Sequence, residues 1–140
     1  MPGAMIAALF FTVALLVTTA YFILGSIPLL VLKHDTPLDA SFVRGFLNVY
    51  YRAAVVTAGA TAVSYAFAGR PGFATGAALL AALAVVLRRK IIPKMDALGA
   101  GIQSRQMDAI PGFRKTHVTA IAINILQLAA IVWSLTASRL

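Results

Sequence analysis

The sequence contains no cysteine and no glutamate, so four aspartates and two histidines are its main candidates for acid, base or metal-binding chemistry. The absence of cysteine excludes disulfides, thiolate nucleophiles and Cys-ligated zinc or iron–sulfur clusters. No Gly-rich phosphate loop, GxSxG elbow or glycosidase-like carboxylate pair can be assembled from the remaining residues. Hydrolase chemistry therefore has little support, and the sequence leaves open whether the protein is an enzyme.

Charge is also scarce, because only 11% of the 140 residues are charged whereas 61% are hydrophobic. The mean hydropathy is +0.90. Soluble domains are about a quarter charged, and a soluble fold of this length buries only about 68% of its extended-chain surface. Much apolar surface would then remain in water. The composition therefore predicts an integral membrane protein.

Four apolar stretches are long enough to cross a bilayer, which takes about 20 helical residues. We expect a single domain, an all-α, antiparallel four-helix transmembrane bundle. The expected spans are about 4–32, 46–68, 73–92 and 117–136.

Local signals predict where these helices begin and end. Gly25–Pro28 predicts a kink or break near the end of the first span, because Pro28 lacks a backbone donor. Thr36 as N-cap, Pro37 as first helical residue and Asp39 in the first turn predict the start of the second helix. The segment 94–115 mixes charged residues, glycine and glutamine with apolar residues, which predicts a partly helical segment at the membrane surface.

The basic residues gather on one face of the predicted bundle, and this sets its orientation. An even number of crossings places both termini on one side, with only two basic residues there, Arg70 and Arg139. The positive-inside rule then predicts both termini on the non-cytoplasmic side and both long loops in the cytoplasm. The net charge of +8 is explained by this topology, so no nucleic-acid partner is expected. The opposite face carries Lys33, Arg44, Arg88, Arg89, Lys90, Lys94, Arg105, Arg114 and Lys115.

Three polar residues of the fourth span follow spacings of seven and three. His117, Asn124 and Gln127 therefore share one stripe of a helix, which we expect to face the bundle interior. For Asn124 and Gln127 the sequence favours hydrogen bonds that clamp neighbouring helices, worth about 0.6 kcal/mol each.

A cofactor is the alternative for His117, because the topology returns His34 and Asp35 to the same face. Two imidazoles and a carboxylate suit zinc, iron or copper, and two histidines can grip a haem iron. The chain lacks the HxxxH and HExxH spacings, which weighs against such a site.

Other polar residues have simpler explanations. Tyr50 and Tyr51 fit interfacial anchors, and Arg52 is expected to snorkel toward the headgroups or to pair with Asp35. One basic group could also bind anionic lipid or an acidic partner surface, at about 1 kcal/mol per charge. It comprises Arg88, Arg89, Lys90, Lys94, Arg114 and Lys115.

The order of motifs resembles a known family. The motifs are Phe42–Phe46 followed by Tyr50 and Tyr51, Arg88–Pro93, and Phe113–His117 followed by Asn124 and Gln127. From about residue 25 to residue 135 the chain resembles the DUF4149 family of bacterial four-helix membrane proteins, related to the eukaryotic TMEM205-like proteins. The resemblance implies the fold and marks His117, Asn124 and Gln127, but it supplies no reaction. The chain has Thr116 where the family pattern has leucine.

These observations favour a non-enzymatic accessory, assembly or binding subunit of a larger membrane complex, which contacts other membrane subunits or copies of itself. The first alternative is a haem- or metal-binding redox protein that uses His117 with His34 or Asp35. In that case Asn124 and Gln127 would orient a quinone or another apolar substrate. The second alternative is an exporter of a hydrophobic or metal-containing solute.

Overall fold

The computed structural model describes residues 2–29, 36–105 and 109–137, and these ranges contain helices and no strand. The predicted all-α class is confirmed. The helices are α1 (Pro2–Leu29), α2 (Pro37–Phe67), α3 (Pro71–Gln103) and α4 (Ala109–Ala137). Three of them, α1, α3 and α4, are long and apolar enough to cross a membrane. This supports an integral membrane protein.

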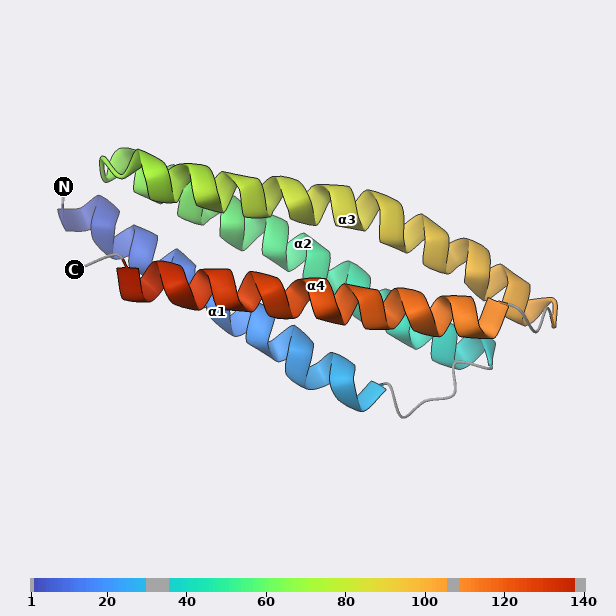
Figure 1. Cartoon of the computed structure of the whole chain (residues 1–140). Coiled ribbons are helices and arrows are strands. Elements are labelled where there is room, and N and C mark those ends of the chain that lie inside the picture. Colours follow the sequence, from blue (N-terminus) through green and yellow to red (C-terminus); the bar gives the residue numbers. More distant parts are fainter. Residues whose placement is uncertain (1, 30–35, 106–108, 138–140) are drawn as a thin grey trace.

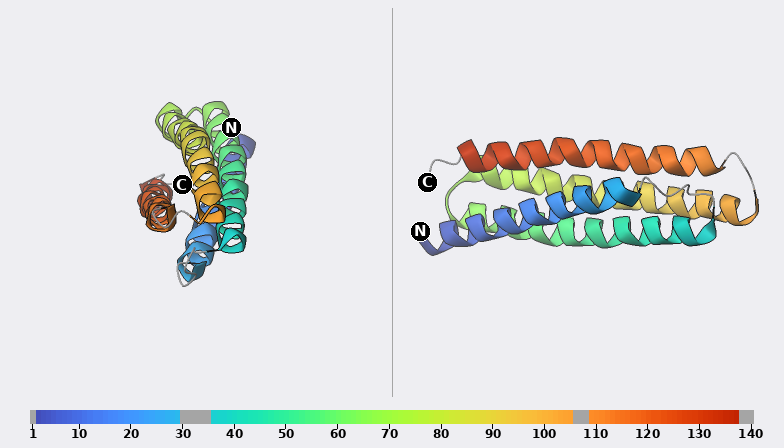
Figure 2. Two further views of the ribbon diagram at one scale, coloured as in Figure 1. Left: turned by 90° about the vertical axis from the view of Figure 1, so that its right-hand side faces the viewer. Right: turned by 90° about the horizontal axis from the view of Figure 1, so that it is seen from below.

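The four helices form a ring in which each packs against two others. Helix α2 packs against α1 and α3, and α4 packs against the same two helices from the opposite side. Figure 1 shows that successive helices run in opposite directions, so that α1 begins and α4 ends at the same end of the bundle. Figure 2 shows α4 standing apart from the other three helices. Contacts of α4 are therefore the critical ones for closing the bundle.

The predicted start of the second helix is confirmed. Thr36 is the N-cap of α2, and its hydroxyl accepts a hydrogen bond from the backbone N–H of Asp39 at 3.2 Å. Pro37 opens the helix, where its missing N–H costs nothing. At the other end of α2, Gly69 has a φ of +72°, a conformation that glycine adopts without steric cost. Helix α3 then starts at Pro71.

Helix α1 continues through Gly25–Pro28 to Leu29, so no break precedes Leu29, and the rest of the expected first span lies outside the described residues. The segment 94–115 is partly helical, as predicted, because α3 extends through Pro93 to Gln103 and α4 begins at Ala109. The third helix is therefore longer than the expected span 73–92. The reason is tertiary packing. Met95 and Ile102 are buried in the apolar core, and their burial outweighs the weak hydrophobic periodicity of this charged segment.

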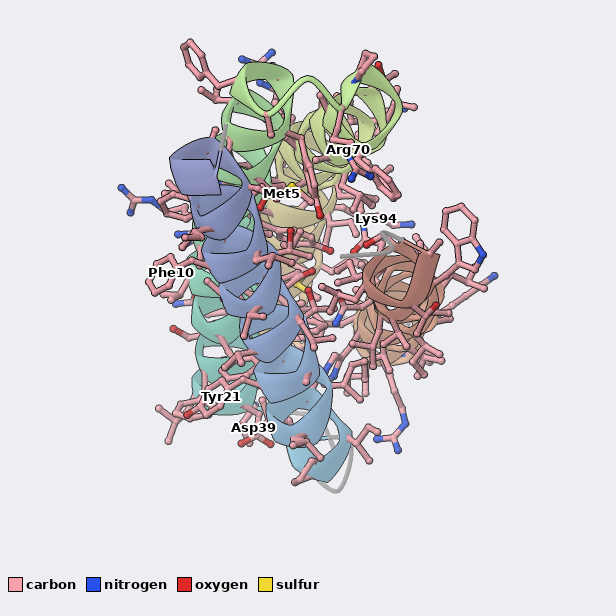
Figure 3. All side chains as sticks on the ribbon, turned by 90° about the vertical axis from the view of Figure 1, so that its left-hand side faces the viewer. Met5, Phe10, Tyr21, Asp39, Arg70 and Lys94 are labelled. Carbon is pink, nitrogen blue, oxygen red and sulfur yellow. The ribbon has the colours of Figure 1, made fainter. Side chains whose placement is uncertain are left out.

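The core combines side chains from all four helices at the end of the bundle where α2 begins. Phe22 from α1, Val43 and Leu47 from α2, Met95 from α3 and Phe113 from α4 belong to one buried cluster. The outer surface is also apolar, as expected for a surface that faces lipid. Its large exposed side chains include Phe10, Tyr21, Leu79, Leu126 and Trp133. Figure 3 shows Phe10 and Tyr21 pointing away from the bundle.

Helix α2 is not among the three apolar spans, although a membrane crossing was expected over 46–68. It carries Asn48, Tyr50, Tyr51, Thr61 and Ser64, which lower its hydropathy. The last four of these are buried against neighbouring helices. Composition alone therefore does not show that most of these polar side chains of α2 are shielded by the neighbouring helices.

Polar contacts join α2 to α3 near the first half of α2. The Arg44 guanidinium pairs with the Asp96 carboxylate at 2.9 Å, and Arg88 Nε donates to Asn48 Oδ1 at 3.0 Å. Both contacts are exposed. An exposed ion pair contributes about 0–1 kcal/mol, so these contacts define the register of the two helices more than they stabilise the fold.

The close approach of α1 to α2 at Gly25 gives a first prediction. A Cβ at Gly25 would lie 2.5 Å from Phe46 Cζ, and the Phe46 ring already stacks on Phe22 at 5.6 Å. We expect Gly25→Ala to lower the midpoint of thermal unfolding in detergent, followed by helical circular dichroism. The matched control is Gly59→Ala in α2, where a Cβ meets nothing within 4 Å. The control should match or exceed the parent; equal shifts for both variants would contradict the packing at Gly25.

Candidate functional site

The polar stripe of α4 faces the inside of the bundle. His117 is 0% exposed, Asn124 is 2% exposed and Gln127 is 8% exposed. Buried residues Ala120, Ile121 and Ile131 lie on the same face. Helical periodicity alone brings these positions together, because spacings of three, four and seven return to one side of the helix.

A second buried polar stripe lies on α1, and sequence reasoning missed it. Thr12, Thr19 and Ser26 are seven residues apart and almost fully buried. The hydroxyls of Thr12 and Thr19 donate to the carbonyl oxygens of Ala8 and Leu15 in their own helix. The regular seven-residue spacing was visible in the sequence. The two threonines attract little attention in an apolar helix because they satisfy themselves locally, whereas the buried Ser26 hydroxyl has no hydrogen-bond partner within the described residues.

The two stripes meet at Thr19 and Asn124. Asn124 Nδ2 donates to the backbone carbonyl oxygen of Thr19 at 3.2 Å. Because α1 and α4 run in opposite directions, seven residues forward on α1 correspond to seven residues back on α4. Ser26 therefore lies near the level of His117.

Tyr50 completes the network from the opposite side of the ring. Its hydroxyl donates to Asn124 Oδ1 and lies 3.3 Å from Gln127 Oε1. A phenol has a single proton, so the nearer Asn124 oxygen takes it, and a turned Gln127 amide can donate to the phenol oxygen. Tyr50 thus connects α2 to α4, the two helices that lie across the bundle from each other.

The expectation that Tyr50 and Tyr51 are interfacial anchors is wrong. Both side chains are buried, at 7% and 2% exposure. The Tyr50 ring packs against Phe22 with centroids 4.1 Å apart and against Tyr51 at 5.2 Å. Burial of Tyr50 is possible because α4 supplies amide partners for its hydroxyl. Arg52, next in sequence, is exposed, as expected for a snorkelling side chain.

This arrangement can hold helices together, and it contains few reactive groups. Tyr50, Asn124 and Gln127 bond to one another or to the backbone of α1. Within the described ranges no group of three or more His, Asp or Glu side chains could hold a metal ion. His34 and Asp35 lie outside the described residues, so their grouping with His117 around a metal or haem stays a prediction.

A cavity of about 200 Å³ lies toward the end of the bundle where α1 begins, and all four helices line it. Its walls include Thr12, Tyr65, Ala77 and Ile131. Tyr65 is 2% exposed, and its ring stacks on Phe73 with centroids 5.3 Å apart. Within the part of the chain that the structure describes, its hydroxyl oxygen has no hydrogen-bond partner. Thr12, Thr61, Tyr65 and Ser134 bring hydroxyl groups to this cavity, and most of its other lining residues are apolar.

The six predicted lipid- or partner-binding cations are all exposed, but they do not form one cluster. Arg88 is turned toward Asn48 of α2. Lys90 and Lys94 of α3 line a groove together with Lys115 of α4. The remaining cations, Arg89 and Arg114, do not line this groove.

Comparison of the chain with protein-family models, with curated proteins and with solved structures finds no match. The resemblance to the DUF4149 and TMEM205-like proteins stays a prediction.

The network gives a second prediction. Tyr50→Phe keeps the buried ring but leaves the Asn124 carbonyl oxygen without its donor. An unsatisfied buried polar group costs about 1–3 kcal/mol, so we expect the variant to lose about 1–2 kcal/mol of stability in detergent unfolding experiments. Tyr21→Phe is the matched control, because Tyr21 is 69% exposed. Comparable stability of both variants would show that the Tyr50 hydroxyl does not clamp the helices.

Proposed function

We propose that the protein is a non-enzymatic subunit of a membrane complex, in which the four helices cross a bacterial inner membrane in antiparallel order. Both termini then lie on the non-cytoplasmic side. The lengths of the helices, 28 to 33 residues, support four crossings, since about 20 residues suffice. Helix α2 fits this proposal although it is less apolar, because most of its polar side chains are buried against other helices.

The orientation follows from the basic residues at the end where α2 begins and α3 ends. Because the chain lacks cysteine, single introduced cysteines can test this directly. Thr136 and Ser104 are both exposed and lie near opposite ends of the bundle. We expect a membrane-impermeant maleimide to label Thr136→Cys in intact spheroplasts and Ser104→Cys only after lysis. Labelling of both from outside would contradict the crossing by α4.

The proposed role as a subunit of a complex rests mainly on the exposure of the outer face of α3. Of the three apolar spans, α3 is the least buried inside the bundle. Its outer stripe contains small residues where lipid-facing helices usually carry large aliphatic ones. Small residues let a second helix approach closely. The exposed stripe comprises Thr75, Ala78, Leu79, Ala82 and Val86.

The internal network supports the non-enzymatic part of this proposal. Polar side chains in the centre of the bundle serve helix packing, since Tyr50 and Asn124 bond within the network. The outer face of α3 is then the part of the molecule best suited to contact another protein. A second copy of the chain or a different membrane helix would cover it.

Cross-linking in native membranes tests this role. We expect Leu79→Cys, on the outer face of α3, to form a disulfide or a short maleimide cross-link with a neighbouring chain. A cysteine would be added to the partner helix if the partner is a different protein. Val56→Cys on the exposed face of α2 is the control at a similar depth and should stay uncross-linked.

A substitution on the same face gives the complementary measurement. Ala82→Leu should shift the protein from a complex to a smaller species on native gels in mild detergent. A strictly monomeric parent protein in native membranes would overturn the proposed function.

A further inference from the structure

A groove of about 460 Å³ runs between α3 and α4 on the half of the bundle that carries most basic residues. Lys90 and Lys94 of α3 border it on one side, and Lys115 of α4 borders it on the other. Figure 3 places Lys94 on the side of α3 that faces α4. Three cations from two helices therefore surround one concave surface.

The charge of this groove is not balanced by the acids that the structure describes. None of the residues that line the groove is acidic. Asp96 of α3 pairs with Arg44 of α2, and Asp39 lies in the first turn of α2. Like charges so arranged repel one another, and a bound anion relieves this repulsion. The groove is thus suited to a phosphate-bearing ligand.

Most of the remaining lining is apolar, and the Thr116 and Thr119 hydroxyls donate to carbonyl oxygens of their own helix. Leu87 and Ile91 of α3 and Ile123 of α4 line the groove on the side toward the middle of both helices. The lysines Lys94 and Lys115 lie nearer the helix ends. A ligand in this groove therefore meets three cations, and aliphatic side chains continue from them toward the bundle centre. Leu98 lines the groove on the other side of the lysines, nearer the bundle end.

This order of polarity matches a membrane lipid. We propose that the groove binds an anionic phospholipid, with the phosphate at Lys90, Lys94 and Lys115 and one acyl chain along Leu87, Ile91 and Ile123. A free phosphate would leave the apolar walls unused. The volume accommodates a headgroup and the upper part of one chain, since pockets for small ligands measure about 300–1,000 Å³. The lipid would also fill the space where α3 and α4 are less closely packed.

Three exposed arginines that do not line the groove supply a matched control. Arg89 is exposed one residue before Lys90 but does not line the groove, and Arg52 and Arg105 are exposed elsewhere. Replacement of these three arginines by glutamine removes the same total charge as replacement of the three lysines. General attraction of anionic lipid to a basic protein would respond equally to both changes, whereas a site would respond to the lysines alone.

Native mass spectrometry of the full chain in mild detergent provides the measurement, with phosphatidylglycerol and phosphatidylcholine as probes. We expect the parent to retain phosphatidylglycerol in preference to phosphatidylcholine. The variant Lys90→Gln/Lys94→Gln/Lys115→Gln should lose at least tenfold in that preference, and Arg52→Gln/Arg89→Gln/Arg105→Gln should lose less than twofold. Equal losses in the two variants, or an unchanged preference in the lysine variant, would overturn the proposal.

Two further measurements identify the source of the phosphate. Ile123→Asn alters only the apolar wall and should weaken retention of phosphatidylglycerol. Inorganic phosphate at millimolar concentration should fail to displace the lipid. Displacement by phosphate, or full retention by Ile123→Asn, would show that the lysines bind a free anion and not a lipid. Helical circular dichroism of each variant verifies that the bundle is intact.

Discussion

The hydrogen bonds among Thr19, Tyr50 and Asn124 are the interaction on which the closed bundle depends. Helix α4 stands apart from its neighbours, so close backbone packing contributes less to its position than it does for α2 and α3. In a hydrocarbon environment no solvent competes for amide and hydroxyl groups, and association between helices depends on shape and on such polar contacts. One cluster joins α1, α2 and α4 because Tyr50 crosses the bundle. Its few polar atoms therefore fix which face of α4 points inward.

Much of the fold was predictable from the sequence, because hydropathy and helical periodicity both reflect the need to satisfy polar groups inside the bundle and to place apolar side chains against lipid. The inward position of Asn124 and Gln127 followed from their spacing, and the start of α2 followed from Thr36 and Pro37. The extension of α3 through Pro93 was not predictable in this way. Its apolar residues are spread among charged ones, and only the presence of α2 and α4 gives Met95 a place to be buried.

The site itself was only half predictable. The sequence showed the acceptors and donors on α4 but not the partners that reach them. Tyrosine is a residue type typical of interfacial anchors. The burial of Tyr50 depends on Phe22 and on the amides of Asn124 and Gln127, which lie 74 and 77 residues away in the chain. Such long-range pairing leaves no local pattern. Likewise, the cations near Lys90 formed one group in the sequence, whereas the side-chain directions separate Arg88 from the groove-lining lysines.

Asn124 lies near the middle of α4, with the lysine-bordered groove on one side of it and the Tyr65 cavity on the other. A straight helix that is held near its midpoint can tilt about that point. Any tilt of α4 about Asn124 that carries one half away from α3 brings the other half closer to it. A rigid tilt of α4 about Asn124 would therefore widen one of these two spaces and narrow the other, without any bend in the helix.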